Sequence, residues 1–440
     1  MDKKALRRAW MRMCVPAALE QSALMIGALL LMLQYGRIGT DAVAILGAGG
    51  VLFGLMQGLV MMVCVGAFVV IARLMGRDNQ HECKAVAASV LTATTLLSFG
   101  IAGVCFAAAP WLARLCVGSD AELVGQTASY LRWLFLSFPL CGIGLASDNI
   151  MRGCGDMKRP LVYQVALNIT QVVVCWVLLS RFDMGLTGVA LAALAARGIE
   201  VALKGFAWLS GRNPLGMKYR PALQWRRLTR SLKVGAPVMI EQVVMQAGYL
   251  IASSLMIQMN TSIAAGYMLA NSIISIIHYP FVGISTAIGA TVGMALGREK
   301  LWEARWCARD CLLWAGGIGT VANIVLFFLY PTIARLYGAD AELLQATLGL
   351  RLGFIVCNIF IGYCHIGAGV LKGAGDTRAM MVITNAGLYV RVAIIAAGVF
   401  WLPAEWALGA VGLSVAVDFL IRGGWAAVRV LRDRWLMIRI

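Results

Sequence analysis

Two glutamates occupy matching places in the sequence, each four residues after a proline in an apolar segment. Glu20 follows Pro16 and Glu241 follows Pro237, and a glutamine comes next in both cases. On a helix this spacing puts the carboxylate about one turn beyond the proline, on nearly the same face. Such a carboxylate could bind a cation or substrate, or close a gate. The alternative is a carboxylate stabilised near a helix N-terminus by the macrodipole and neighbouring basic residues.

Three further ionisable residues lie deep inside apolar segments. Arg391 and Asp418 sit about twelve residues into two consecutive segments that run in opposite directions, so their depths differ by about 6 Å. Because a lone charge near mid-bilayer costs about 2.5 to 3.5 kcal/mol, we expect a structural ion pair. If Asp418 exchanged Arg391 for a cation, it would instead be a coupling site. His365 is expected either to titrate or to be a hydrogen-bonded core histidine.

Uncharged polar residues form short stripes at helical spacing. A polar face in lipid must point at protein or at a water-filled cavity. The stripes therefore indicate either interhelical hydrogen bonds or the wall of a binding cleft. Their members are Gln164, Asn168 and Gln171, then Tyr267 and Asn271, and finally Asn385.

The composition shows which elements must position these residues. Only 13% of the 440 residues are charged and 60% are hydrophobic, which is too little charge to cover a soluble globule of this size. Apolar segments long enough to cross about 30 Å of hydrocarbon recur along the chain. We predict twelve transmembrane helices, at 14–34, 42–74, 85–109, 125–151, 160–180, 185–209, 235–259, 262–295, 307–330, 342–370, 379–401 and 406–429.

The basic residues set the orientation. Most of the 38 Lys and Arg fall in alternate loops and at the termini, on one side of the predicted topology. Only four fall on the other side: Arg37, Arg114, Arg181 and Arg335. By the positive-inside rule both termini are cytoplasmic, in a multi-pass protein of the inner membrane. The net charge of +17 is therefore an orientation signal that also attracts anionic lipids, and nucleic acid is not expected as a partner.

An internal repeat sets the architecture. The shift that carries Pro16 onto Pro237 also aligns Gly76 with Gly297, and after one deletion RGCGD at 152–156 meets KGAGD at 372–376. Each copy holds six predicted helices, so both copies begin on the same side of the membrane. We predict an all-α polytopic protein made of two six-helix bundles related by a pseudo-twofold axis along the membrane normal.

The predicted domains follow from this repeat. Residues 1–209 form an N-terminal six-helix lobe and residues 234–440 a C-terminal one. The intervening 210–233 is rich in Gly, Pro, Arg and Lys and is expected to be a cytoplasmic linker, partly an amphipathic surface segment.

Other chemistry is not indicated. The twelve cysteines are scattered through apolar segments without CxxC or Cys/His metal spacing, so no metal or other cofactor is expected. The Gly-x-Gly of 152–156 and 372–376 lacks a preceding strand and a following GKS or GKT, which argues against a nucleotide site. A convincing nucleophile or acid–base pair is also missing, so we do not expect an enzyme.

Several motifs at successive helix boundaries resemble one family, the multidrug and toxic compound extrusion (MATE) transporters. They are PAALEQ at the first helix, YGRIGTDAVA after it, GRDN and GREK after the second and eighth helices, RGCGDMKRP and KGAGDTR, and VLRDRW near the end. The resemblance covers essentially the whole chain. It implies two six-helix lobes that export small organic, often cationic, molecules by alternating access, as a secondary antiporter driven by H+ or Na+.

The chain departs from the family at the acidic sites. Many members carry a buried aspartate late in the first helix, where this chain has Leu31, and another in the fifth, where it has Val172. In another branch a glutamate occupies the place of Met245. The residues that bind the coupling ion therefore do not carry over, and Glu20, Glu241 and Asp418 are the acidic candidates.

The alternative function is a flippase of the same superfamily for a lipid-linked or polysaccharide precursor. It requires a cationic cleft that suits phosphate, for which several arginines within predicted helices are available: Arg132, Arg197, Arg351, Arg391 and Arg422. The additional helices of some flippases are missing. For either function we expect a monomer in contact with membrane lipids.

Overall fold

The structure is a computed structural model of the 440-residue chain. It describes residues 3–36, 38, 40–117, 121–259, 261–336, 344, 359–401 and 404–438. The predicted residue Arg351 and most of the predicted tenth helix lie outside these ranges. Within them the chain is helical and contains no strand.

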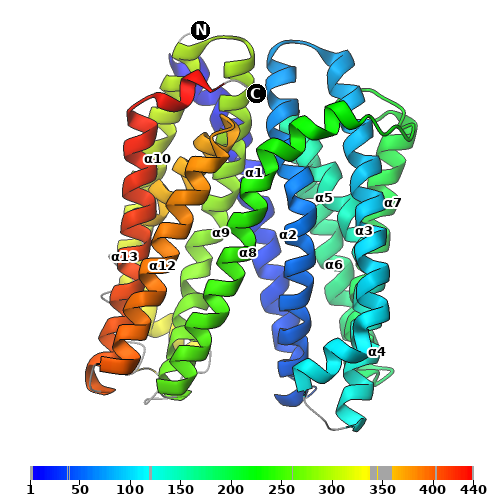
Figure 1. The fold of residues 1–440 in the computed structure, drawn as a ribbon, viewed down its shortest axis with the longest axis vertical. Coiled ribbons are helices and arrows are strands. Elements are labelled where there is room, and N and C mark those ends of the chain that lie inside the picture. Colours follow the sequence, from blue (N-terminus) through cyan, green and yellow to red (C-terminus); the bar gives the residue numbers. More distant parts are fainter. Residues whose placement is uncertain are drawn as a thin grey trace. The chain divides into compact units, whose positions relative to one another are not determined.

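Long helices make up nearly all of the described chain (Figure 1). In lipid, a helix satisfies its own backbone N–H and C=O groups, which accounts for this choice of secondary structure. Among the described residues, 11 helical stretches are long and apolar enough to cross a membrane, and Ile359–Gly373 is a shorter apolar helix. The elements are α1 (Lys3–Tyr35), α2 (Thr40–Gly76), α3 (Gln80–Val117), α4 (Ala121–Leu136), α5 (Phe138–Gly153), α6 (Lys158–Ser180), α7 (Gly185–Ser210), α8 (Trp225–Met259), α9 (Thr261–Gly297), α10 (Leu301–Leu336), α12 (Thr377–Trp401), α13 (Ala404–Leu431) and η1 (Arg434–Met437).

The predicted fourth helix, 125–151, is broken in two. Helices α4 and α5 are separated at Ser137, and Pro139 stands in the first turn of α5. Proline has no N–H to give to the preceding turn, which favours a helix start at this point. The hydroxyl of Ser137 donates to the carbonyl of Leu134 at 2.7 Å, which satisfies a buried backbone group in the last turn of α4.

The chain forms two compact units whose boundaries cut through two helices. One unit consists of Met1–Ala18 and Ile240–Ile440, and the other of Leu19–Met239. We call them the C-terminal and the N-terminal unit. The boundaries fall just after Pro16 in α1 and Pro237 in α8, the prolines aligned by the repeat. The C-terminal unit therefore contains the start of α1, the first helix of the first repeat, together with most of the second repeat. The N-terminal unit contains the start of α8, the first helix of the second repeat, together with most of the first repeat.

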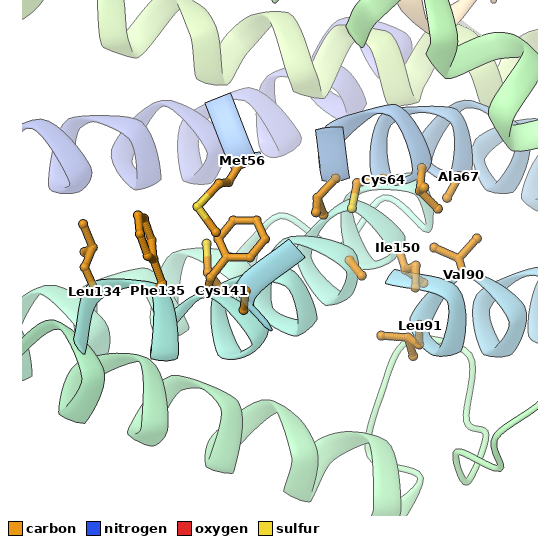
Figure 2. Packing of buried hydrophobic residues seen from close by; sticks show 14 of the residues in the cluster. Met56, Cys64, Ala67, Val90, Leu91, Leu134, Phe135, Cys141 and Ile150 are labelled. Carbon is orange, nitrogen blue, oxygen red and sulfur yellow. The ribbon is translucent and has the colours of Figure 1, made fainter. Parts of the chain in front are cut away.

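In the N-terminal unit, α2, α3, α4 and α5 share a densely packed core (Figure 2). Met56 and Cys64 of α2, Phe135 of α4 and Ile150 of α5 are buried there. Between helices in lipid, close packing of small residues replaces the hydrophobic effect as the driving force. Gly153 shows this, because a Cβ there would lie 2.9 Å from the carbonyl oxygen of Phe68.

The start of α8 is packed into the N-terminal unit. A Cβ on Gly66 would lie 1.9 Å from the Ser231 carbonyl oxygen, and one on Gly235 would lie 1.7 Å from that of Met62. The backbones of α2 and α8 are therefore in direct contact through glycines. At the loop end of α3, the Arg227 guanidinium donates to the Glu82 carboxylate at 2.8 and 3.0 Å.

The start of α1 has the equivalent place in the C-terminal unit. A Cβ on Gly283 of α9 would lie 2.1 Å from the carbonyl oxygen of Ala17. The Arg7 guanidinium donates to both carboxylate oxygens of Asp310 in α10, at 2.9 and 2.5 Å, and the Trp10 indole donates to the same carboxylate at 3.2 Å. The two repeats thus exchange the beginnings of their first helices.

Candidate functional site

The RGCGD and KGAGD sequences adopt the same helix-ending turn. The N–H of Asp156 donates to the carbonyl of Met151 at 3.0 Å, and that of Asp376 to Leu371 at 2.8 Å. Gly155 and Gly375 both have φ of 82°, in the left-handed region where glycine is favoured. This is the Schellman arrangement of a helix C-terminus. The turn places Arg152 and Lys372 at equivalent positions in the last turn of their helices.

These two basic residues pair with the two repeated glutamates. The Arg152 guanidinium contacts the Glu20 carboxylate within the N-terminal unit, and the Lys372 Nζ lies 3.0 Å from Glu241 Oε1 within the C-terminal unit. Both glutamate side chains are buried, with 3% and 7% of their surface exposed. Both repeats therefore contain a buried ion pair between the first helix of the repeat and the RGCGD or KGAGD turn.

The Glu241 carboxylate has a second hydrogen-bond partner on one oxygen, and its other oxygen is unpaired among the described residues. The Thr384 hydroxyl of α12 donates to Glu241 Oε1 at 3.2 Å, so both partners converge on one carboxylate oxygen. Glu241 Oε2 is buried and has no hydrogen-bond partner among the residues that the structure describes. A buried carboxylate oxygen in this state can accept a further hydrogen bond or coordinate a cation.

In the N-terminal unit the ion pair continues into a network. Lys204 of α7 lies 2.8 Å from Asp148 Oδ1 and 2.5 Å from Glu200 Oε1, and Arg197 lies 3.4 Å from Glu200 Oε2. Both carboxylates are buried, with Asp148 at 7% and Glu200 at 2% exposure. The spacings of Glu200 to Arg197 and Lys204, three and four residues on one helix, could have indicated the network from the sequence.

In the C-terminal unit Asp418 has two arginine partners. Arg422, one turn later on α13, holds both carboxylate oxygens, with Nε donating to Oδ1 at 2.5 Å. Arg391 of α12 reaches Oδ2 through a single contact of 3.4 Å. The structure thus brings the expected Arg391 and Asp418 together, but Arg422 is the closer partner. The i, i+4 spacing of Asp418 and Arg422 was the overlooked signal.

Two tyrosines surround Arg391. Its guanidinium donates to the hydroxyl of Tyr267 in α9, and its carbon lies 5.3 and 5.6 Å from the ring centroids of Tyr249 and Tyr267. These distances are within the range of cation–π attraction. Tyr249 of α8 was not predicted.

His365 pairs with a histidine that the sequence did not single out. Its Nε2 lies 3.1 Å from Nδ1 of His278 on α9, and the rings meet edge to face with centroids 4.4 Å apart. One ring must donate and the other accept. No group of three or more His, Cys, Asp or Glu residues with metal-binding geometry occurs in the described ranges.

The members of the polar stripes differ in their contacts. Gln164 donates to Asn168 at 3.0 Å, and Asn168 donates to the Ala23 carbonyl of α1 at 2.6 Å, an interhelical bond of the kind expected from a packing role. Asn271 of α9 is exposed. Asn385 Oδ1 is buried and has no hydrogen-bond partner among the described residues.

Long apolar helices with buried, repeat-related ion pairs are typical of a polytopic membrane protein. The MatE family model matches the chain twice, at residues 16–177 and 237–396, which together exceed half of its length. The chain therefore belongs to the MatE family, the one that the sequence resembles. The two matches begin at the two repeated prolines.

Individual relatives agree with this assignment. The chain is 24% identical over 396 residues to the probable multidrug resistance protein YoeA of Bacillus subtilis, covering 87% of this chain and 85% of that protein. It is 21% identical to the probable multidrug resistance protein NorM of Thermotoga maritima, covering 98% and 93%.

A solved structure, a mutant of the MATE transporter VcmN from Vibrio cholerae, has a TM-score of 0.87 at 17% identity, over 98% of this chain and 97% of that one. The predicted fold class and family resemblance are confirmed. The family is a transporter family, and these findings favour efflux over the flippase alternative.

Proposed function

We propose that this chain is a multidrug exporter that couples outward movement of small organic molecules to inward movement of H+ or Na+. The relatives YoeA and NorM are named as probable multidrug resistance proteins. The observation that carries the coupling proposal is the pair of buried glutamates with basic partners, Glu20 with Arg152 and Glu241 with Lys372.

The chemistry follows from what a buried ion pair costs to break. A proton or Na+ that neutralises Glu241 removes the attraction for Lys372, and a buried charge without its partner is strongly unfavourable. The basic side chain must then move toward water or toward another acceptor. Since a ligand shifts a conformational equilibrium only through its different affinity for the two states, this movement is the required difference.

The test is export by purified protein in proteoliposomes, with separate H+ and Na+ gradients and a panel of dyes and antibiotics. Glu241→Gln keeps the shape and removes the charge, and we expect it to slow gradient-driven export while folded protein is retained. Arg378→Gln is the matched control, because Arg378 is exposed at the start of α12. Absence of substrate movement in the wild type under either gradient would refute coupled export, and unchanged export by Glu241→Gln at every pH would assign Glu241 to packing.

A further inference from the structure

The fixed charges inside the two units do not balance in the same way. In the N-terminal unit the buried network contains three carboxylates and three cations: Glu20, Asp148 and Glu200 with Arg152, Arg197 and Lys204. In the C-terminal unit, Glu241 pairs with Lys372, while Asp418 faces both Arg391 and Arg422. Among the described residues, the first network is neutral and the second carries one surplus positive charge.

The surplus charge belongs to Arg391. Arg422 takes both oxygens of Asp418 in a bidentate pair, which is the strong form of the interaction, whereas Arg391 makes one contact at 3.4 Å. The other buried acids of the unit have their own basic partners, Glu303 with Lys300, Asp310 with Arg7 and Asp376 with Arg429. In the register that aligns Gly155 with Gly375, Arg391 falls on the uncharged Gln171.

Arg391 also has unused hydrogen-bonding capacity. The residue is 3% exposed, and its Nε has no hydrogen-bond partner in the described part of the chain. A guanidinium has five donors in a planar fork suited to a carboxylate. In the described part of the unit, Asp418 is the one carboxylate in contact with Arg391, and Arg422 already holds it. A buried cation with an unpaired donor in this position favours an anionic ligand.

The surroundings suit the apolar body of an organic anion better than a bare ion. The rings of Tyr249 and Tyr267 flank the guanidinium, and the thioether of Met245 lies 3.6 Å from Arg422 Nη1. Aromatic rings and methionine pack against varied flat or apolar groups.

We propose that Arg391, Tyr249 and Tyr267 form a carboxylate-binding site in the C-terminal unit, and that it selects anionic or zwitterionic organic substrates. This rests on the proposed export function and specifies its substrate class. It replaces the expectation of mainly cationic substrates, because a carboxylate completes the charge balance at Arg391 and an isolated cation adds to the surplus.

The experiment compares rhodamine B, which carries a free carboxylate, with its ethyl ester, which has the same ring system and lacks that charge. Fluorescence anisotropy with purified protein measures both dissociation constants without depending on transport. In the wild type we expect the acid to bind about tenfold more tightly than the ester, about 1.4 kcal/mol. Arg391→Gln should abolish this preference, Arg391→Lys should retain part of it, and Arg378→Gln on the same helix should leave it unchanged.

Arg391→Gln is expected to fold, because Asp418 keeps its bidentate partner Arg422; the thermal unfolding midpoint checks this. Equal binding of acid and ester by the wild type, or a preference that survives Arg391→Gln, overturns the proposal. Displacement of rhodamine B by chloride, but not by benzoate at the same concentration, also overturns it in favour of an inorganic anion site. If both dyes bind as expected and neither is exported, the function proposal fails and the carboxylate site stands.

Discussion

The buried pair Glu241–Lys372 should show a large coupling energy in a double-mutant cycle. Thr384 and Lys372 both contact one oxygen of Glu241, and the Glu241 side chain is only 7% exposed. Glu241→Gln leaves the ammonium of Lys372 without its carboxylate, at a cost of about 1 to 3 kcal/mol. This is less than the cost for a fully buried pair, because Lys372 is 23% exposed and its long side chain can turn toward water.

Lys372→Gln should cost more than Glu241→Gln, about 3 kcal/mol, because it leaves the more deeply buried charge uncompensated. The double variant retains neither charge and should be more stable than the sum of the single effects predicts. We expect a coupling free energy of about 1 to 3 kcal/mol. The measurement is unfolding of the purified variants by SDS in mixed micelles, followed through the fluorescence of the 13 tryptophans.

The matched control is the pair Glu82–Arg227. Its closest contact is 2.8 Å, but its side chains are 32% and 21% exposed, so its coupling should be only about 0.2 to 1 kcal/mol. The reasoning from burial is refuted if the two cycles give the same coupling. It is also refuted if Glu241→Gln and Lys372→Gln are additive within about 0.3 to 0.5 kcal/mol.

Three further outcomes follow from the geometry. Gly66→Ala should destabilise the N-terminal unit by several kcal/mol, because the added Cβ would lie 1.9 Å from the Ser231 carbonyl oxygen. Gly50→Ala is the control and should be harmless, because a Cβ there meets nothing within 4 Å. Equal midpoints of the two variants in SDS unfolding would contradict this reasoning. Gly375→Ala, at φ of 82°, should cost about 1 to 2 kcal/mol in the same assay, while Gly205→Ala within α7 should stabilise by about 0.5 to 1 kcal/mol. With cytoplasmic termini, the end of α3 faces the outside, so Cys116 as the only cysteine should react with a membrane-impermeant maleimide in intact cells. Asn79→Cys, as the only cysteine, should react only after lysis, because the turn before α3 faces the cytoplasm. The reverse pattern would show that the termini are not cytoplasmic.

Much of the architecture could be predicted because it depends on local sequence patterns, namely the length of apolar segments and the internal repeat. Apolar length gave the helices, and the repeated proline and glutamate positions identified Glu20 and Glu241 as equivalent. The basic partners Arg152 and Lys372 could not be paired with them from spacing alone, because these contacts join residues 132 and 131 positions apart. Only the fold brings the start of each repeat against the turn that ends its fourth segment.

Other differences have local causes. The break at Ser137 follows from Pro139, which an apolar-length argument does not weigh. The partnership of Arg422 with Asp418 was predictable, because their spacing of four residues places both on one face of α13. His278 and Tyr249 carried no signal of their own, since a histidine or tyrosine in an apolar helix is informative only when its neighbour across the interface is known.

The exchange of helix beginnings between the repeats has a consequence for biosynthesis. The N-terminal unit ends at Met239, so it lacks the α8 segment that packs on Gly66 until the ribosome has passed the linker. The first residues of α1 are made earliest, yet their partners Asp310 and Gly283 are made much later. Insertion must therefore hold the start of α1 without its native neighbours through most of translation. Separately expressed halves divided within 211–224 would each lack one such segment, and we expect them to assemble only when produced together.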